Sequence, residues 1–291
     1  MTLVLQNDVD KRRVAATFEK AASTYDEHDF LQREVAVRAM ERLDYVSLQA
    51  RRVLDVGSGT GRCASALARR YRRASVLQCD LAWGMLHRAR TGASRFFSRQ
   101  TYVCADVEQL PLKDDAFDLA FANLSLQWCR DLGRAFREIH RVLEPGGLVL
   151  FTTFGPDTLQ ELRAAWAQIS NTPHVLRFFD MHDVGDVLVA SGFAEPVMET
   201  DYITVQYNDV MTLMRDLKGI GASNSVMDRG RGLLGRRALK ALIDAYESCR
   251  DKGRLPATYE VIYGHAWAAD VVATGQGGGV HTFPLERLRR R

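Results

Sequence analysis

Three glycines at alternate positions give the clearest chemical signal in this sequence. The run VLDVGSGTG carries an apolar strand past Asp55 and then places Gly57, Gly59 and Gly61 ahead of a helical pattern that starts near Arg62. Such a turn brings bare backbone to the carboxyl end of a strand, and residues without a Cβ let a ligand approach that closely. Arg62 stands where a G-x-G-x-x-G fingerprint needs its last glycine, so a dinucleotide site is not predicted.

Acidic residues end the next two predicted strands. Asp80 closes the strand 75–79, where its carboxylate can accept hydrogen bonds from both hydroxyls of an adenosine ribose. Alternatively, Asp80 caps the helix that follows. Asp106 ends the strand 102–105, where a carboxylate could meet an adenine amino group. Acidic residues at three neighbouring strand ends therefore predict a nucleoside site.

A polar and aromatic cluster follows the strand at 117–122. Asn123, Gln127 and Trp128 supply hydrogen-bonding groups and a flat apolar wall beside a reacting carbon. In the alternative interpretation, Trp128 anchors the following helix and Gln127 faces water.

The elements that would position these residues alternate along the chain. Hydrophobic periodicity predicts N-terminal helices over 10–22 and 30–43, after which strands and helices follow each other. The predicted strands are 52–56, 75–79, 101–105, 117–123, 147–154, 197–207 and 258–267; the predicted helices are 61–71, 83–91, 131–142, 157–169, 182–191, 208–218 and 236–250. This order predicts an α/β, Rossmann-like fold: a mostly parallel seven-stranded sheet with helices on both faces and the last strand antiparallel at an edge.

Composition is that of an ordinary soluble protein, with 291 residues, 46% hydrophobic and 26% charged. Residues 1–13 are too charged for a signal peptide, and no window reaches the roughly 18 apolar residues of a membrane span. Five scattered cysteines without a C-x-x-C pair predict reduced thiols and a cytoplasmic location. No two histidines have the helical i, i+4 spacing of metal ligands, so no metal site is predicted.

The net charge of +3 conceals a basic segment. Between Met211 and Arg254, ten Lys and Arg residues against five Asp and Glu give +5, which leaves −2 for the rest of the chain. A basic field of this kind attracts an acidic partner, although a solvated helical face would give the same count. Five glycines over Gly219–Gly235 predict a mobile loop in this segment.

These patterns divide the chain into five parts. They are an N-terminal helical lid (1–45), a ligand-binding core (46–207), a basic helical insertion (208–256), the final strand of the core (257–273) and a flexible basic tail (274–291).

The glycine turn and Asp80 resemble the motifs of class I S-adenosylmethionine (AdoMet) methyltransferases. More narrowly, the sequence resembles the malonyl-acyl-carrier-protein O-methyltransferases of biotin synthesis over about residues 14–267. The run LKGIGA at 217–222 is the most discriminating segment, and the others are FEKAASTYD (18–26), NLSLQWC (123–129), FTTF (151–154), LQEL (159–162), Pro173-His174, Arg177-Phe178 and GRLPATY (253–259). No proline follows Asn123, which argues against methylation of DNA bases.

The resemblance implies a role for each site residue. The AdoMet contacts would be Asp55, Gly57, Ser58, Gly59 and Gly61 on the methionine part, Asp80 and Leu81 at the ribose and adenine, Asp106 and Val107 at the adenine edge, and Asn123. The catalytic residues on the substrate side would be Tyr25, Gln127 and Trp128, although Tyr25 could instead be lid packing. Arg130 or Arg177 would pair with the substrate carboxylate, beside Phe178.

The activity that the resemblance implies is methylation of the free carboxylate of a malonyl thioester on acyl carrier protein, with S-adenosylhomocysteine as the other product. The ester removes an anion that an apolar acyl pocket would reject, so that the chain can prime pimeloyl synthesis. The acidic carrier would dock on Lys218, Arg236 and Arg237, and neither nucleic acid nor membrane is an expected partner. Two rivals remain: a methyltransferase of a small free acid such as trans-aconitate, and a methyltransferase-like assembly factor without methyl transfer.

Overall fold

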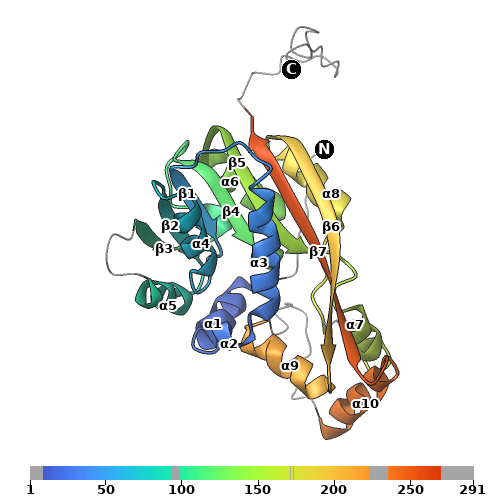
Figure 1. Cartoon of the computed structure of the whole chain (residues 1–291). Helices are drawn as coiled ribbons and strands as arrows, with labels where there is room; N and C mark the ends of the chain where they lie inside the picture. The colour runs from blue at the N-terminus through green and yellow to red at the C-terminus, as the bar shows by residue number, and fades with distance from the viewer. Residues whose placement is uncertain (1–8, 94–98, 171, 173, 223–234, 270–291) are drawn as a thin grey trace, which may run out of the picture.

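A seven-stranded sheet forms the centre of the protein, with strand order β3-β2-β1-β4-β5-β7-β6 (Figure 1). The computed structural model describes residues 9–93, 99–170, 172, 174–222 and 235–269. Most of the predicted Gly219–Gly235 loop, Pro173 and the predicted tail 274–291 lie outside the described residues. The strands are β1 Arg52–Val56, β2 Ser75–Asp80, β3 Gln100–Cys104, β4 Phe117–Asn123, β5 Leu143–Phe154, β6 Phe193–Tyr207 and β7 Leu255–Ala268.

The first five strands pair in parallel, and β7 runs antiparallel to both β5 and β6. The predicted fold class is therefore confirmed. The predicted edge position of the last strand is wrong, because β7 lies between β5 and β6, and β6 forms the edge. Burial explains the difference: β7 is buried along most of its length, whereas buried, half-buried and exposed residues are mixed along β6.

Helices cover both faces of the sheet. The helices are α1 Lys11–Ala21, α2 Tyr25–His28, α3 Phe30–Arg42, α4 Arg62–Arg70, α5 Trp83–Gly92, α6 Leu132–Val142, α7 Gln160–Ala167, α8 Met181–Ala190, α9 Val210–Gly219 and α10 Arg236–Glu247. Two short 3₁₀ turns, Val107–Gln109 and Leu126–Trp128, follow β3 and β4.

Alternate residues of the strands enter two separate hydrophobic cores. In β4, Leu119 and Phe121 join the core under α3, α4 and α7, whereas Ala120 and Ala122 join the core under α6 and α8. This alternation follows from the two-residue repeat of a β-strand. Because both faces are buried, the sheet presents its ligand-binding groups at its carboxyl edge.

Two sets of helices gather at that edge. Helices α1 and α2 come from the N-terminus. Helices α9 and α10 come from the segment that joins β6 to β7, and these two strands extend beyond the other strands of the sheet (Figure 1). The predicted insertion before the last strand thus corresponds to a pair of helices held at the far end of two long antiparallel strands.

Candidate active site

The glycine turn between β1 and α4 requires left-handed backbone at three positions. The φ angles of Gly57, Gly59 and Gly61 are +67°, +54° and +82°. A Cβ on Gly57 would lie 2.2 Å from Cβ of Ser125, and one on Gly61 would lie 2.8 Å from Oε1 of Gln78, whereas one on Gly59 would meet no atom within 4 Å. Gly57 and Gly61 are therefore needed for packing, whereas the absence of a side chain at Gly59 lets a ligand come close to the backbone of the turn.

Asp80 at the end of β2 holds this turn in place. Its Oδ2 accepts a hydrogen bond from the N–H of Gly59 at 2.9 Å, and its Oδ1 accepts one from the N–H of Ala82 at 2.8 Å. Ala82 is the N-cap residue of α5, and no described side chain caps that helix, so Asp80 binds the residue before the first turn and is not the helix cap of the alternative interpretation. Burial raises the pKa of Asp80 to about 6. These two backbone hydrogen bonds and a ligand-binding role are compatible, because each oxygen has a second lone pair.

A cavity opens in front of the turn, and we call it the glycine-turn cavity. Nine of the predicted site residues line it: Tyr25, Gly57, Gly59, Asp80, Leu81, Asp106, Val107, Asn123 and Trp128. Lys11, Phe18, Met85 and Ser125 are lining residues that the sequence did not single out. Tyr25, which was expected on the substrate side, belongs to this cavity and packs near Ala82 and Met85. Burial and nearby carboxylates raise the pKa of Tyr25, so its phenol remains a proton donor.

Three other predicted contacts, Asp55, Ser58 and Gly61, lie behind the surface of this cavity. Asp55 is only 1% exposed, and burial raises its pKa to about 7. Within the described part of the chain, neither Oδ2 of Asp55 nor Oγ of Ser58 has a hydrogen-bond partner. A buried carboxylate and a hydroxyl without partners suit an ammonium group, such as that of the methionine part of AdoMet.

Asp106 pairs with a lysine of the N-terminal helix α1. Nζ of Lys11, at the start of α1, lies 2.5 Å from Oδ1 of Asp106 and 2.5 Å from Oε1 of Glu108. The lid helix therefore contacts the carboxylate that was predicted to meet the adenine amino group. Lys11 was not predicted as a site residue, because the sequence of an amphipathic helix does not indicate which distant strand end its side chains contact.

Further contacts fix α1 and α2 over the turn. Oε2 of Glu19 accepts a hydrogen bond from the N–H of Gly84 at 2.6 Å, and Oδ1 of Asp26 accepts one from the hydroxyl of Thr60 at 2.7 Å. Nε of Arg62 donates to the buried Asp29 at 3.0 Å. Arg62, the residue that excluded a dinucleotide fingerprint, thus binds the N-terminal helices to the core.

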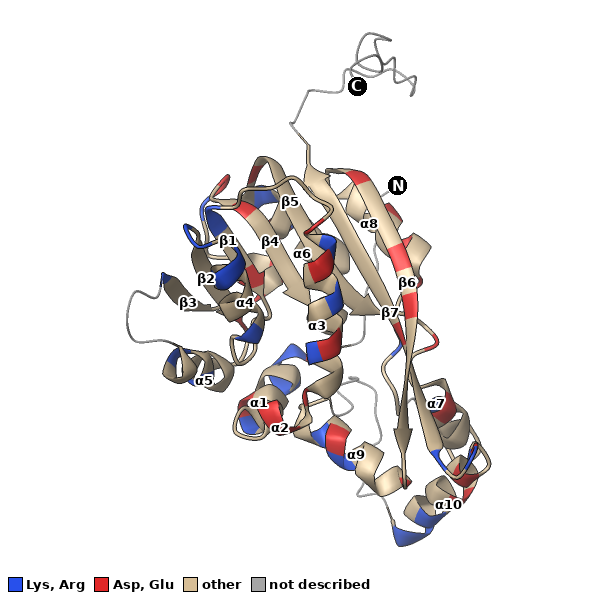
Figure 2. Cartoon of the chain, viewed as in Figure 1, with Lys and Arg blue, Asp and Glu red and all other residues tan. Residues whose placement is uncertain are grey.

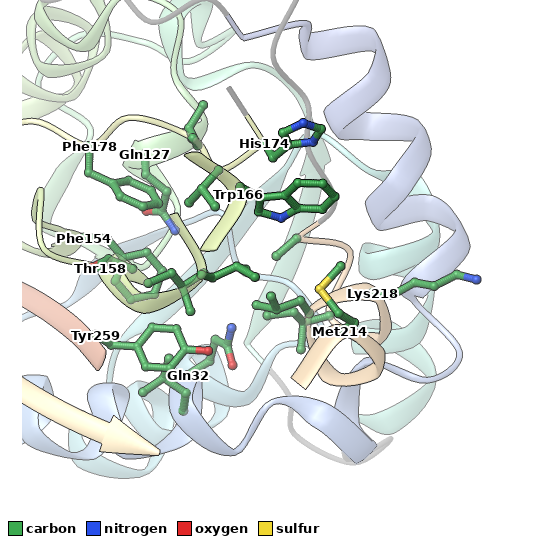
Figure 3. Close-up of a pocket in the computed structure, with 18 of the residues that line it drawn as sticks. Gln32, Gln127, Phe154, Thr158, Trp166, His174, Phe178, Met214, Lys218 and Tyr259 are labelled. Carbon is green, nitrogen blue, oxygen red and sulfur yellow. The ribbon is translucent and has the colours of Figure 1, made fainter. Parts of the chain in front are cut away.

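A second, larger cavity adjoins the first, and we call it the apolar cavity (Figure 3). Its volume is about 560 Å³, within the usual range of small-molecule sites. Most of its lining is hydrophobic, including Phe154, Leu162, Trp166, Phe178 and Met214. Trp128 lines both cavities, and Phe18 meets it edge to face with ring centroids 5.4 Å apart.

Two glutamines bring polar groups into the apolar cavity. Gln127 is 5% exposed, and its Nε2 donates to the carbonyl of Leu124 at 2.7 Å. The alternative in which Gln127 faces water is therefore wrong. Oε1 of Gln127 and Oε1 of Gln32, on α3, are buried and have no hydrogen-bond partner among the described residues.

Asn123 connects three elements beside these cavities. Its Oδ1 accepts a hydrogen bond from the hydroxyl of Thr152 on β5 at 2.9 Å, and its Nδ2 donates to the carbonyl of Gln32 at 3.1 Å. The side chain lines the glycine-turn cavity and at the same time fixes α3 to β4 and β5.

The predicted cations separate into three groups. Lys218 is among the residues that line the apolar cavity (Figure 3). Arg215, which the sequence did not single out, lines it too. Arg236 and Arg237 are exposed in the first turn of α10. Lys and Arg outnumber Asp and Glu in α9 and α10, which carry charges of both signs (Figure 2). Arg130 and Arg177 are exposed and line neither cavity, so the structure does not support the expected pairing of either one with a buried substrate carboxylate.

The run LKGIGA joins the insertion to the lid. A Cβ on Gly219 would lie 2.2 Å from Cδ2 of His28, and Gly221, at φ +76°, packs against Phe18. Nδ1 of His28 lies 2.8 Å from Oδ1 of Asp216 on α9. The two glycines are therefore explained by the close approach of α9 to α1 and α2.

Comparison with known proteins identifies the family. Residues 54–151 match the family model described as a methyltransferase domain. The chain is 52% identical over 264 residues to the malonyl-(acyl-carrier protein) O-methyltransferase of Methylovorus sp. strain MP688, with 89% of each chain covered. It is 40% identical over 288 residues to malonyl-(acyl-carrier protein) O-methyltransferase 1 of Coxiella burnetii, with 98% of each chain covered. The chain belongs to the malonyl-(acyl-carrier protein) O-methyltransferase family.

Solved structures with low sequence identity share the fold of this methyltransferase. YcgJ of Bacillus subtilis aligns with a TM-score of 0.58 at 16% identity, over 80% of this chain and 98% of that chain. Phosphoethanolamine N-methyltransferase 2 of Haemonchus contortus, in complex with S-adenosyl-L-methionine, aligns with a TM-score of 0.55 at 17% identity, over 87% of this chain and 57% of that chain.

No helix among the described residues of the methyltransferase is long and apolar enough to cross a bilayer. Within the same residues, no three His, Cys, Asp or Glu side chains gather as a metal-binding group. The described site consists of two adjoining cavities that share Trp128, one lined in part by the carboxylates of Asp80 and Asp106 and one mostly apolar.

Proposed function

We propose that the protein transfers the methyl group of AdoMet to the free carboxylate of a malonyl thioester carried on acyl carrier protein. The observation that carries this proposal is 52% identity to a relative of that name over 89% of both chains. The methyl ester would prime pimeloyl synthesis for biotin in the cytoplasm, and S-adenosylhomocysteine would be released.

The reaction needs alignment more than acid–base chemistry. A carboxylate oxygen forms a bond to the methyl carbon while the carbon–sulfur bond of the sulfonium breaks, and the electron pair of that bond stays on sulfur. AdoMet supplies a methyl group that is already activated by the positive sulfur. Since the acceptor is ionised at neutral pH, no proton has to be removed, and alignment alone can contribute about 7–11 kcal/mol in favourable cases.

The residues of the glycine-turn cavity would bind and orient the methyl donor. Asp80 has lone pairs left for ribose hydroxyls after it has accepted its two backbone hydrogen bonds. Asp55 and Ser58 would bind the amino group of the methionine part with their unpartnered oxygens. Helices α1 and α2 would exclude water, and the protonated phenol of Tyr25 would donate a hydrogen bond within the cavity.

The apolar cavity would hold the acceptor. Trp128 borders both cavities, and its indole would form the wall beside which the carboxylate meets the methyl group. Phe178 and the other apolar side chains would enclose the uncharged part of the acyl chain. Exposed Arg236 and Arg237, together with Lys218, would attract the acidic carrier protein (Figure 2).

A labelling experiment tests this function. The purified protein is incubated with methyl-labelled AdoMet and malonyl-carrier protein, and the carrier is then examined for label that dilute base releases, as expected for a methyl ester. Acetyl-carrier protein, which lacks the free carboxylate, is the matched control and should remain unlabelled. Label on trans-aconitate but not on malonyl-carrier protein would contradict the proposal.

A further inference from the structure

The two glutamines of the apolar cavity limit which part of a substrate can lie there. Oε1 of Gln32 and Oε1 of Gln127 are buried without hydrogen-bond partners among the described residues, and both side chains line the cavity. A buried acceptor without a donor destabilises the protein until a ligand supplies the missing N–H or O–H. Figure 3 shows these glutamines on different sides of the cavity, Gln127 near Phe178 and Gln32 near Tyr259.

An unpaired acceptor oxygen attracts N–H or O–H groups and repels an anion. One of the two hydrogens on Nε2 of Gln127 already goes to the carbonyl of Leu124, and the buried atom without a partner is Oε1. A carboxylate beside Oε1 of Gln127 or Gln32 would be both desolvated and repelled. The reacting carboxylate therefore belongs at Trp128, next to the glycine-turn cavity, and an uncharged chain with N–H donors belongs beside the glutamines.

Two exposed cations of the cavity lining have the opposite preference. Arg215 and Lys218 of α9 line the apolar cavity and are its only Arg or Lys among the described lining residues. They suit an anion at the end of the bound chain that is remote from the reaction.

We propose that the apolar cavity binds the phosphopantetheine arm of the thioester, with Gln32 and Gln127 accepting hydrogen bonds from its two amide N–H groups and Arg215 binding its phosphate. This inference rests on the proposed function. The arm is a narrow chain with two uncharged amides and a terminal phosphate, and the lining of the cavity offers apolar walls, two acceptors and two cations to match them. The terminal torsion of a glutamine is soft, so a small rotation turns each covered oxygen toward a bound N–H.

The test replaces one hydrogen-bond donor at a time. The probes are malonyl-pantetheine and two analogues in which an ester oxygen replaces one or the other amide N–H. The wild type should methylate the parent probe about tenfold more efficiently, in kcat/KM, than either analogue, because each analogue leaves an acceptor unpaired. In Gln32→Met the discrimination against one analogue should disappear, and in Gln127→Met the discrimination against the other should disappear.

Control variants and a binding measurement distinguish failure of this inference from failure of the proposed function or of folding. Met214→Leu changes an apolar lining residue at nearly constant volume, so it should keep the discrimination against both analogues. Calorimetry with S-adenosylhomocysteine shows whether each variant is folded and binds the donor product. If the wild type methylates neither malonyl-carrier protein nor malonyl-pantetheine, the proposed function fails. Equal rates with all three probes, or unchanged discrimination in both glutamine variants, would overturn the present inference and leave methyl transfer standing.

The cationic end is tested with the phosphorylated probe. The wild type should prefer malonyl-phosphopantetheine to malonyl-pantetheine by about tenfold, and Arg215→Gln should remove most of that preference. Arg177→Gln is the matched control, since Arg177 is exposed and lines neither cavity. A preference that persists in Arg215→Gln but disappears in Arg177→Gln would show that the phosphate binds elsewhere.

Discussion

The two carboxylate oxygens of Asp80 accept backbone hydrogen bonds, and they are also the proposed acceptors for the ribose hydroxyls. Replacement by alanine leaves the N–H groups of Gly59 and Ala82 unpaired and removes the acceptors for the ribose hydroxyls. We expect Asp80→Ala to bind S-adenosylhomocysteine about 10–100-fold more weakly, since hydrogen bonds to a charged group contribute about 1.5–3 kcal/mol. Isothermal titration calorimetry measures the loss.

The control for this variant removes a carboxylate elsewhere. Asp44 lies on the surface, where it pairs with Arg70 at 2.7 Å, and Asp44→Ala should bind the ligand as the wild type does. Wild-type affinity in a folded Asp80→Ala protein would show that the ribose binds to another residue.

Asp55 and Asp80 predict a pH dependence of ligand binding. Burial raises their pKa values to about 7 and about 6, so the folded chain retains protons that the unfolded chain has lost. Their contribution to stability is therefore present at low pH and falls as the pH rises through these values. A bound ammonium group favours the ionised carboxylates, so the increase in Tm caused by S-adenosylhomocysteine should be larger at about pH 8 than at about pH 5.5.

The contribution of Asp55 can be isolated by Asp55→Asn, which removes the titrating group from behind the cavity. In this variant the ligand-induced Tm shift should lose the part of its pH dependence near pH 7. The same dependence in wild type and variant would assign the titration to another group.

The sequence predicted the local part of the site but not its distant partners. Asp55, Asp80 and the glycines were recognisable because their roles follow from a strand end and a tight turn. Lys11 and Gln32 were not, since each reaches its cavity through a fold that joins residues far apart in the sequence. Arg177 was chosen for its charge, but no sequence pattern indicated that its loop leaves it exposed.

At the scale of elements, the contact between α9 and α2 depends on the absence of one side chain. A Cβ on Gly219 would lie 2.2 Å from the His28 ring, and that ring is held by Asp216. We expect Gly219→Ala to cost about 1–3 kcal/mol of unfolding free energy, and to weaken donor binding because α1 and α2 border the glycine-turn cavity. Thermal unfolding and calorimetry measure the two effects.

Gly92 offers a matched substitution at the end of α5. A Cβ there would meet no atom within 4 Å, and alanine favours a helix more than glycine does, so Gly92→Ala should keep or slightly raise the Tm. An equal loss of stability in both variants would exclude the His28 contact as the cause.

The order of strands and helices was predictable because each element has its own hydrophobic repeat. The position of β7 was not, since an antiparallel strand near the end of a chain can add to an edge or insert beside β5 with the same local pattern. Its nearly continuous burial, in contrast to β6, is the signal that distinguishes the two outcomes. The roles of the lid and of the insertion remain proposals.

For the whole molecule, the uneven distribution of charge predicts how an acidic carrier approaches. We expect the triple variant Lys218→Glu, Arg236→Glu and Arg237→Glu to raise the KM for malonyl-carrier protein about tenfold or more, and to weaken its dependence on salt. Turnover of malonyl-pantetheine, which has no protein surface to dock, should change much less. Steady-state kinetics at low and moderate salt measures both.

A triple reversal with the same net charge serves as the control. Arg69, Arg72 and Arg73 are exposed at and after the end of α4, and their reversal should leave the KM for the carrier nearly unchanged. Equal increases in KM in the two triple variants would indicate a general effect of net charge rather than a docking surface on α9 and α10.

Trp128 lines both cavities, so its intrinsic fluorescence can report the binding of either ligand. Because one indole borders both cavities, its fluorescence emission should respond to the nucleoside on one side and to the thioester on the other. Trp128→Phe should abolish the change caused by S-adenosylhomocysteine, while the emission of Trp83, Trp166 and Trp267 remains. An unchanged response would mean that another indole senses the ligand. The order in which the two substrates bind could then be followed in real time without any label.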